Sequence, residues 1–264
     1  MKKIVIINWK MNGNIYDIRL LVEQLILFYK KKVNLTKFIV IPPFIYIPLV
    51  VSILKKKGDM LDVFCGAQNI YPRDNGPFTG EISASMLKDY DCRYVLVGHF
   101  ERRSIFKEND ALISKKFHFL QSKKMIPILC IGESDVERKN KKTELVLENQ
   151  LLSILTKNSD LIDSSEEIFF KDCIIAYEPI WAINNRKVIL DMVYLQDTIS
   201  FIKNFIFKIN KGFDRNVHVV YGGGVNKDNV KFLFSKLKIN GVLIGRSSLN
   251  LYNFLDIVKC INLY

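Results

Sequence analysis

Short apolar runs recur along the chain, and the segments between them are long enough for one helix each. Eight runs, most of them rich in Val and Ile, fall at residues 3–8, 38–41, 62–67, 94–98, 126–131, 174–178, 217–221 and 241–245. Continuous apolar runs such as Ile4-Val5-Ile6-Ile7 are typical of parallel strands buried on both faces. In 145–155 and 193–207, apolar residues return every three or four positions, which predicts helices. Eight alternations of strand and helix predict an α/β fold, a (β/α)8 barrel.

The alternation runs through the whole chain without a linker or a repeat boundary, so residues 1–264 are predicted to form a single barrel domain. Barrels of roughly 200–250 residues commonly fold as one domain. The alternative is a doubly wound open sheet, which favours a Gly-x-Gly-x-x-Gly turn after its first strand. That position holds Asn8-Trp9-Lys10-Met11-Asn12-Gly13, so the barrel is the preferred interpretation.

Composition and hydropathy exclude several classes of protein. Of the 264 residues 49% are hydrophobic, far more than an intrinsically disordered chain carries. The uncharged run from Phe38 to Leu54 contains three prolines and is shorter than the about 20 apolar residues of a membrane-spanning helix. The apolar stretch at the N-terminus is too short for a secretion signal. We therefore expect no membrane partner and a cytoplasmic protein; an organelle or plastid is the alternative if a targeting segment was trimmed.

The net charge of +12 is compatible with nucleic-acid binding or with a solvated basic surface. The basic clusters at residues 30–32, 55–57 and 138–142 fall near the ends of helix-like segments, where cations interact favourably with the helix dipole. No aromatic residues are interleaved with them as in nucleic-acid-binding surfaces. We therefore expect no nucleic-acid partner.

The five cysteines are odd in number and form no Cys-x-x-Cys pair. Four of them lie in or beside apolar runs, so they are interpreted as reduced thiols rather than as disulfides or zinc ligands. No metal site and no redox cofactor are predicted.

Chemically active side chains collect where the predicted strands end. Asn8 and Lys10 follow the first strand, His99 and Glu101 follow the fourth, and Glu178 closes the sixth. Glycine-rich turns follow the seventh and eighth strands, at residues 222–224 and 245. Each feature alone has a simple structural explanation. Together they are informative, because the active sites of (β/α)8 barrels lie at the carboxyl ends of the strands.

These residue types suit one kind of reaction. Glycine turns let backbone N–H groups approach a phosphate closely. A partly desolvated Glu178 would be an effective base. His99 could donate to a carbonyl oxygen, and Lys10 could offset the charge of an enediolate. The sequence therefore predicts proton abstraction next to the carbonyl of a small phosphorylated substrate.

The chain resembles the triosephosphate isomerase family in seven ordered motifs that extend over nearly its whole length. They are Asn8-Trp9-Lys10-Met11-Asn12-Gly13, Gly66-Ala67-Gln68-Asn69, Phe78-Thr79-Gly80-Glu81-Ile82-Ser83, Val97-Gly98-His99-Phe100-Glu101-Arg102-Arg103, Cys130-Ile131-Gly132-Glu133, Ala176-Tyr177-Glu178-Pro179-Ile180-Trp181-Ala182-Ile183 and Tyr221-Gly222-Gly223. The resemblance implies an aldose–ketose isomerase of glycolysis and gluconeogenesis. It would interconvert dihydroxyacetone phosphate and D-glyceraldehyde 3-phosphate without a cofactor.

The resemblance also implies a role for each central residue. Glu178 matches the catalytic base and His99 the neutral imidazole that acts as electrophile. Lys10 matches the cation that stabilises the enediolate, and Glu101 a residue that orients the lysine and the base. Asn8 matches a residue that contacts the substrate.

Residues 179–189 match a mobile lid that closes over the substrate. Its first half contains Pro179, Trp181 and Ile183, and Ile183 is expected to clamp the base together with Leu243. The expected phosphate contacts, mostly through backbone N–H groups, are Asn184, Gly224, Gly245 and Arg246.

The family usually forms a homodimer, and residues 68–81 match the loop that inserts beside the partner's active site. Thr79 is expected to reach the partner's Asn8 and Lys10. Glu81 and Arg102 match a pair that meets across the interface.

The chain departs from the family's usual pattern in the active-site region. Phe100 and Gly224 stand where serines are usual, Asn184-Asn185-Arg186 replace Gly-Thr-Gly, and Arg246 replaces a glycine. The changes in the lid predict less stable closure, and the Arg246 side chain is expected either to bind the phosphate or to point to solvent. A second hypothesis is therefore a related barrel with reduced activity that acts as an interaction protein.

Overall fold

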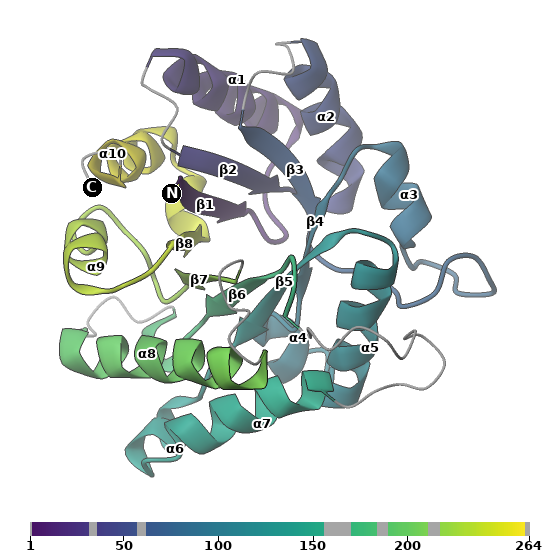
Figure 1. The fold of residues 1–264 in the computed structure, drawn as a ribbon. Coiled ribbons are helices and arrows are strands. Elements are labelled where there is room, and N and C mark those ends of the chain that lie inside the picture. The colour runs from purple at the N-terminus through teal and green to yellow at the C-terminus, as the bar shows by residue number, and fades with distance from the viewer. Residues whose placement is uncertain are drawn as a thin grey trace.

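A computed structural model describes residues 2–31, 36–56, 62–155, 170–183, 190–210 and 217–261. Eight parallel strands form a closed barrel in sequence order, with β1 hydrogen-bonded to β8 (Figure 1). The strands are β1 Lys3–Asn8, β2 Thr36–Ile41, β3 Val63–Ala67, β4 Tyr94–Val97, β5 Ile126–Ile131, β6 Ile174–Tyr177, β7 His218–Tyr221 and β8 Gly241–Ile244. The predicted (β/α)8 architecture is confirmed.

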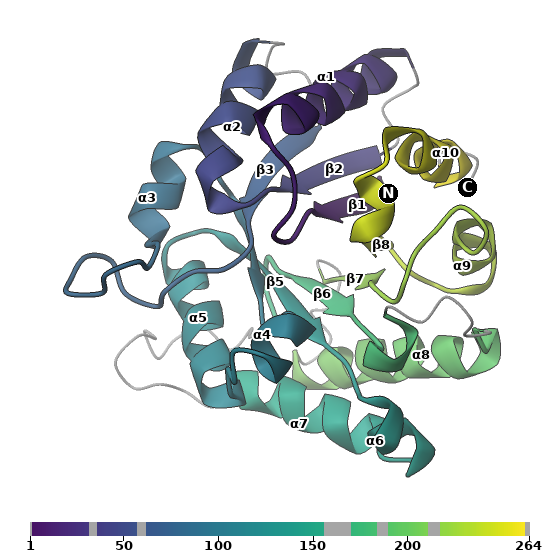
Figure 2. The same cartoon turned by 180° about the vertical axis from the view of Figure 1, so that it is seen from behind.

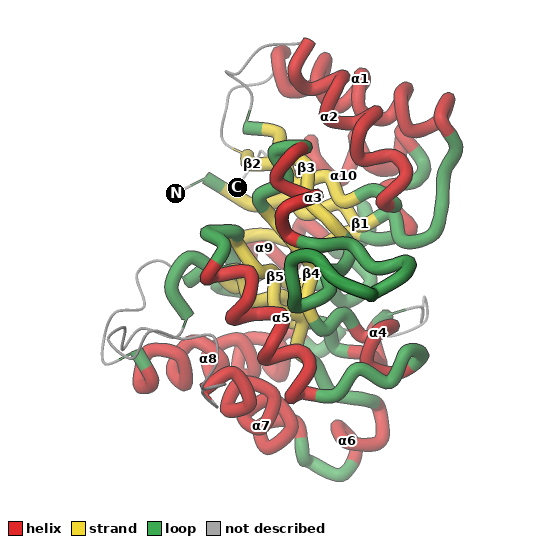
Figure 3. The backbone as a smooth tube through the Cα atoms, turned by 90° about the vertical axis from the view of Figure 1, so that its right-hand side faces the viewer, coloured by secondary structure: helices red, strands yellow, loops and turns green. Residues whose placement is uncertain are grey.

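Helices surround the barrel, as the view from behind also shows (Figure 2). They are α1 Ile15–Lys31, α2 Ile47–Lys56, α3 Ala84–Asp89, α4 Phe100–Ser104, α5 Asp110–Ser122, α6 Asp135–Lys139, α7 Thr143–Leu155, α8 Met192–Ile209, α9 Val230–Lys236 and α10 Leu251–Ile261. Short 3-10 turns are η1 Phe44–Tyr46, η2 Ile180–Ala182 and η3 Arg246–Ser248. In the side view, red helices flank the yellow strands (Figure 3).

Each strand contributes to two apolar layers, which is why the strands read as continuous apolar runs. In β1, Ile4 and Ile6 belong to the cluster inside the barrel, while Val5 and Ile7 belong to the larger cluster that includes the helices. Successive side chains of a strand point to opposite faces, so both faces of β1 are buried. The hydrophobic effect therefore stabilises the barrel through both faces of its strands. Polar side chains are then found mainly at the strand ends.

The strand and helix boundaries differ from the predicted ones by only one to two residues. Strands β4, β6 and β8 each end one residue before the predicted limit, so Gly98, Glu178 and Gly245 lie just beyond the ladder. At Gly98 the reason is local, because its φ of +71° turns the chain out of the strand. Helix α8 begins where Asp191 accepts hydrogen bonds from the N–H groups of Val193 and Tyr194, an N-cap. The active residues thus stand on the first residues after rigid strands.

All five cysteines are free, as predicted. Basic residues occupy the last turns of α2 and α6, where Lys55 pairs with Asp91 and Lys139 with Asp135. The predicted placement of the basic clusters at helix ends is therefore confirmed for these two helices.

No helix in the part of the chain that the structure describes is long and apolar enough to span a membrane.

Candidate active site

Glu178 follows β6 directly, and its side chain is almost completely buried. Two glycines make room for it. A Cβ atom on Gly132 would lie 2.0 Å from the carbonyl oxygen of Glu178, and one on Gly222 would lie 2.9 Å from its Cγ. Both separations are too short for a real contact, so the turns after β5 and β7 require glycine here. The backbone of two neighbouring strands therefore fixes the position of this carboxylate.

Burial raises the pKa of Glu178 to about 7. Hydrogen bonds from the Phe100 backbone N–H, at 3.3 Å from Oε2, and from the Cys130 thiol oppose this rise, as does the charge of Lys10. Burial disfavours the charged form because the protein interior solvates a carboxylate poorly. A carboxylate with this pKa is a much stronger base than an exposed glutamate.

His99 is the N-cap of α4, and this position determines its tautomer. Its Nδ1 accepts a hydrogen bond from the Glu101 N–H at 3.3 Å, so the proton of the neutral ring lies on Nε2. Nε2 is 3.3 Å from Oε1 of Glu178. Burial, together with the charges of Lys10 and Arg102, lowers the pKa of His99 to about 3. The side chain is therefore a neutral hydrogen-bond donor that faces the base.

Lys10 has a strained backbone, with a φ of +53° in the left-handed region. Its N–H donates to Asn8 Oδ1 at 2.9 Å, and its carbonyl oxygen accepts from Gln68 Nε2 at 2.7 Å. Its ammonium pairs with Glu101 at 2.6 Å. Side chains from the ends of β1, β3 and β4 thus hold this lysine in the site, and the predicted cluster of Asn8, Lys10, His99, Glu101 and Glu178 is brought together.

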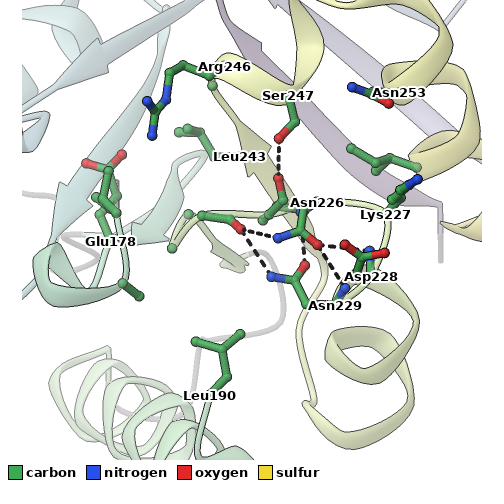
Figure 4. A pocket seen from close by; sticks show the side chains of 18 of the residues that line it. Glu178, Leu190, Asn226, Lys227, Asp228, Asn229, Leu243, Arg246, Ser247 and Asn253 are labelled. Atoms are coloured by element: carbon green, nitrogen blue, oxygen red, sulfur yellow. Dashed lines mark hydrogen bonds between the residues drawn. The ribbon is translucent and has the colours of Figure 1, made fainter. Parts of the chain in front are cut away.

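A cavity of about 580 Å³ extends from Lys10, His99 and Glu178 across the turns after β7 and β8. Gly224 has a φ of +63°, and its carbonyl oxygen accepts hydrogen bonds from Asn226 and Asn229 (Figure 4). The Ser247 hydroxyl donates to the Val225 carbonyl, which ties the two turns together. Gly224, Gly245 and Arg246 all line the cavity. These three residues, which are predicted to contact the phosphate, thus lie around the same cavity.

The Arg246 side chain is exposed and lines the cavity, and in Figure 4 it extends toward the side on which Glu178 lies. In the part of the chain that the structure describes, no carboxylate pairs with it. The side chain thus lies beside the cavity and is exposed to solvent at the same time.

The first half of the predicted lid lies over Glu133. Trp181 Nε1 donates to this carboxylate at 2.7 Å, and the Tyr177 and Tyr194 hydroxyls donate to it at 3.1 Å each. Pro179 is buried, and Ile183 and Leu243 both line the cavity. Asn184 and the rest of the lid up to residue 189 lie outside the described residues. The base of the lid is therefore anchored by a buried carboxylate.

The sequence interpretation gave three of these residues no role. Gln68 supports Lys10, the Cys130 thiol limits the rise in the pKa of Glu178, and Glu133 anchors Trp181. All three stand within the quoted motifs. Gln68 follows β3, Cys130 lies near the end of β5, and Glu133 follows β5. Membership of a motif was the available signal, but only the geometry shows which neighbour each residue contacts.

Of the residues expected at a dimer interface, Thr79 and Glu81 do not line the active-site cavity, whereas Arg102 directly follows Glu101. Thr79 and Glu81 are exposed on the long connection between β3 and α3. This connection projects away from the barrel in Figure 1. Arg102 pairs with the buried Glu108 at 2.5 Å within the same chain.

The described part of the chain contains no cluster of three or more His, Cys, Asp or Glu residues placed to hold a metal ion. The site is instead built from one carboxylate base, one neutral imidazole, one ammonium and a wall of backbone turns. This set of groups suits acid–base chemistry on a bound anion.

Comparison with known proteins identifies one family over nearly the whole chain. The family model for triosephosphate isomerase matches residues 3–261. A triosephosphate isomerase of Legionella pneumophila (strain Paris) is 44% identical over 99% of both chains. Those of Buchnera aphidicola subsp. Baizongia pistaciae and Wigglesworthia glossinidia brevipalpis are 39% identical over 95% of both chains and 37% identical over 99% and 97%. None of these comparisons supports the interaction-protein hypothesis. The chain belongs to the triosephosphate isomerase family.

Proposed function

We propose that the chain interconverts dihydroxyacetone phosphate and D-glyceraldehyde 3-phosphate with Glu178 as the base. The observation that carries the proposal is a buried carboxylate whose pKa is raised to about 7 beside an imidazole whose pKa is lowered to about 3. One group can accept a proton near neutral pH, and the other stays uncharged and donates a hydrogen bond. This division of roles suits proton transfer between two adjacent carbons.

The steps follow from the geometry. Glu178 removes a proton from the carbon next to the carbonyl group, and the C–H electron pair forms the enediolate double bond. The Nε2–H of His99 donates to the carbonyl oxygen as it gains charge, and the Lys10 ammonium offsets that charge. His99 mediates proton exchange between the two oxygens. Glu178 then returns its proton to the neighbouring carbon, so no atom is gained or lost.

Substrate binding is assigned to the two ends of the cavity. Asn8 and Lys10 contact the reacting end, and the backbone N–H groups of Gly224, Gly245 and Asn184 contact the phosphate. Arg246 adds a cation at the phosphate end, where the geometry of a guanidinium suits phosphate oxygens. Closure of the lid, whose first half contains Trp181 and Ile183, would exclude water, with Ile183 and Leu243 clamping the base.

A homodimer is the second part of the proposal. Large apolar side chains are exposed on loops after neighbouring strands β1, β2 and β4: Met11 is 94% exposed, Ile45 77% and Phe106 63%. The loop with Thr79 and Glu81 follows β3 on the same side. An exposed apolar area of this kind is typical of an interaction surface. A second copy would cover it and bring Thr79 to the partner's Asn8 and Lys10, and Glu81 to the partner's Arg102.

Sedimentation of the full chain tests the dimer. We expect Met11→Lys to dissociate it, whereas Val136→Lys should leave it intact, because Val136 is 67% exposed on α6. A monomeric parent chain would contradict the proposal. If both variants sediment as dimers, the interface does not include Met11.

A cytoplasmic location and the absence of nucleic-acid and membrane partners complete the proposed function.

A coupled turnover assay with glyceraldehyde 3-phosphate tests the reaction itself. We expect turnover by the parent chain and loss of on the order of a thousandfold for Glu178→Gln, since a positioned base contributes about 10²–10⁴ in rate. An inactive parent chain would contradict the proposed reaction. An unaffected variant would contradict the role of Glu178.

A further inference from the structure

Phe100 occupies a position where the family usually has serine, and its ring lies among the catalytic groups. It is the first residue of α4 and lines the active-site cavity. Its ring centroid is 4.8 Å from that of His99, with an angle of 44° between the planes. The Lys10 ammonium lies 4.7 Å from the same centroid. One aromatic ring thus contacts two of the three central side chains.

The ammonium of Lys10 has two neighbours of different kinds. Glu101 accepts one of its three N–H groups at 2.6 Å, and the Phe100 ring is close enough for a cation–π interaction. A second carboxylate would also hold the ammonium, but it would offset its positive charge. An uncharged aromatic ring holds the cation and leaves its charge available to a developing anion.

The geometry points to Phe100 as a positioning residue, whose ring holds the Lys10 ammonium in the place where it meets the reacting oxygens. The inference rests on the proposed function for its effect on turnover, but the contact between ring and ammonium can be tested by binding alone. Phe100 forms no bond with the substrate; it acts through Lys10.

The contact with the base does not depend on the ring. The Phe100 backbone N–H is the group that donates to Glu178, and any residue except proline retains it. Replacing the side chain therefore changes the environment of Lys10 and His99 while the hydrogen bond to Glu178 persists. This separation makes the ring a suitable target for substitution.

Two changes of the ring test the inference in the full chain. Phe100→Leu removes the aromatic face and keeps an apolar side chain. Incorporation of 3,4,5-trifluorophenylalanine at position 100 keeps the ring's shape and withdraws the electron density that attracts a cation. We expect kcat/KM to fall about fivefold for Phe100→Leu and about threefold for the fluorinated ring, the size of a partly desolvated cation–π contact. A fluorinated protein that matches the parent would overturn the inference, because a packing role alone predicts that result.

A double-mutant cycle then shows whether the ring acts through Lys10. The probe is 2-phosphoglycolate, a phosphorylated carboxylate that resembles the enediolate in charge, and its dissociation constant is measured by calorimetry. Phe100→Leu should weaken binding about fivefold in the parent chain and by less than about 1.5-fold in the Lys10→Gln background. An equal loss in both backgrounds, or no loss in either, would overturn the inference.

The two proposals can fail separately. A parent chain that binds 2-phosphoglycolate and shows the coupling without turning over glyceraldehyde 3-phosphate would contradict the proposed function and retain the role of Phe100. Turnover of glyceraldehyde 3-phosphate without any effect of ring fluorination would support the proposed function and contradict the role of Phe100. The thermal unfolding midpoint of each variant, measured alongside, shows that a loss of binding does not come from unfolding.

Discussion

Two glutamates follow adjacent strands of the barrel, and their surroundings give them opposite uses. Glu133 follows β5 and Glu178 follows β6, and their exposed fractions are 0% and 2%. Three aromatic side chains donate hydrogen bonds to Glu133, whereas Glu178 accepts one from the Phe100 backbone N–H and faces the Nε2 of His99 at 3.3 Å. Burial raises the pKa of both carboxyl groups. The carboxylate with three hydrogen-bond donors from side chains anchors the lid, and the one with fewer donors is free to take a proton.

The largest expected difference between the two glutamates is in turnover. Glu178→Gln should lower kcat/KM about a thousandfold, while Glu133→Gln should lower it by no more than about tenfold, since Glu133 supports Trp181 and lies apart from the reacting atoms. The coupled assay measures both under the same conditions. Similar losses in the two variants would show that the two carboxylates do not have separate roles.

Replacing either glutamate should change stability, and the change should depend on pH. The folded-state pKa of Glu178 lies above the ordinary value of 4.5, so its ionisation destabilises the fold as the pH rises from about 4.5 to about 7. Glu178→Gln removes that cost and should raise the free energy of unfolding at pH 8. The pKa of Glu133 is raised as well, so Glu133→Gln removes a cost of the same sign. A glutamine accepts fewer of the three hydrogen bonds made to Glu133, so the gain in the free energy of unfolding should be smaller than for Glu178→Gln.

Urea unfolding at pH 8 and pH 4 checks these directions. The gain from Glu178→Gln should be lost at pH 4, where the parent carboxyl is protonated in both the folded and unfolded states. If Glu178→Gln destabilises the chain at pH 8, the carboxylate has stabilising partners beyond those described above.

A smaller effect concerns the cation that faces Glu178 across the cavity. Arg246→Gly restores the family's usual residue, and we expect KM to rise about fivefold with little change in kcat, since one charge-assisted hydrogen bond to the phosphate is lost. Lys56→Gln at the end of α2 is the matched control, because it removes one exposed charge away from the site. Steady-state kinetics at two salt concentrations distinguish a local contact from the net charge. Equal effects of the two substitutions would indicate that only the overall field matters.

The sequence predicts the barrel well, because each strand is apolar on both faces and its pattern does not depend on distant partners. Val5 and Ile6 face different layers of the core, and both are apolar for the same reason. The clustering of Lys10, His99 and Glu178 is predicted as well, since all three stand at strand ends that a barrel must bring together. The motifs that carry the family resemblance narrow the prediction to one reaction.

What the sequence does not predict is which side chains meet across strands. Gln68 and Lys10 are far apart in the chain, and only the closed barrel places the amide on the lysine carbonyl. The same holds for the Phe100 ring and the Lys10 ammonium. Phe100 could be recognised in advance as a departure from the family, but its contact with the cation depends on the φ of +53° at Lys10. Cross-strand contacts of this kind follow from three-dimensional register, which local patterns do not contain.

The pH dependence of kcat/KM tests the central claim most directly, because it reports the pKa of the free enzyme's base. With Glu178 titrating at about 7 and His99 neutral above about 3, kcat/KM should begin to fall below about pH 7, and any further break at about pH 6 should belong to the substrate phosphate. Glu133→Gln should keep the break at the same pH. A profile that stays flat to pH 5 would place the base at an ordinary glutamate pKa and contradict the account of Glu178.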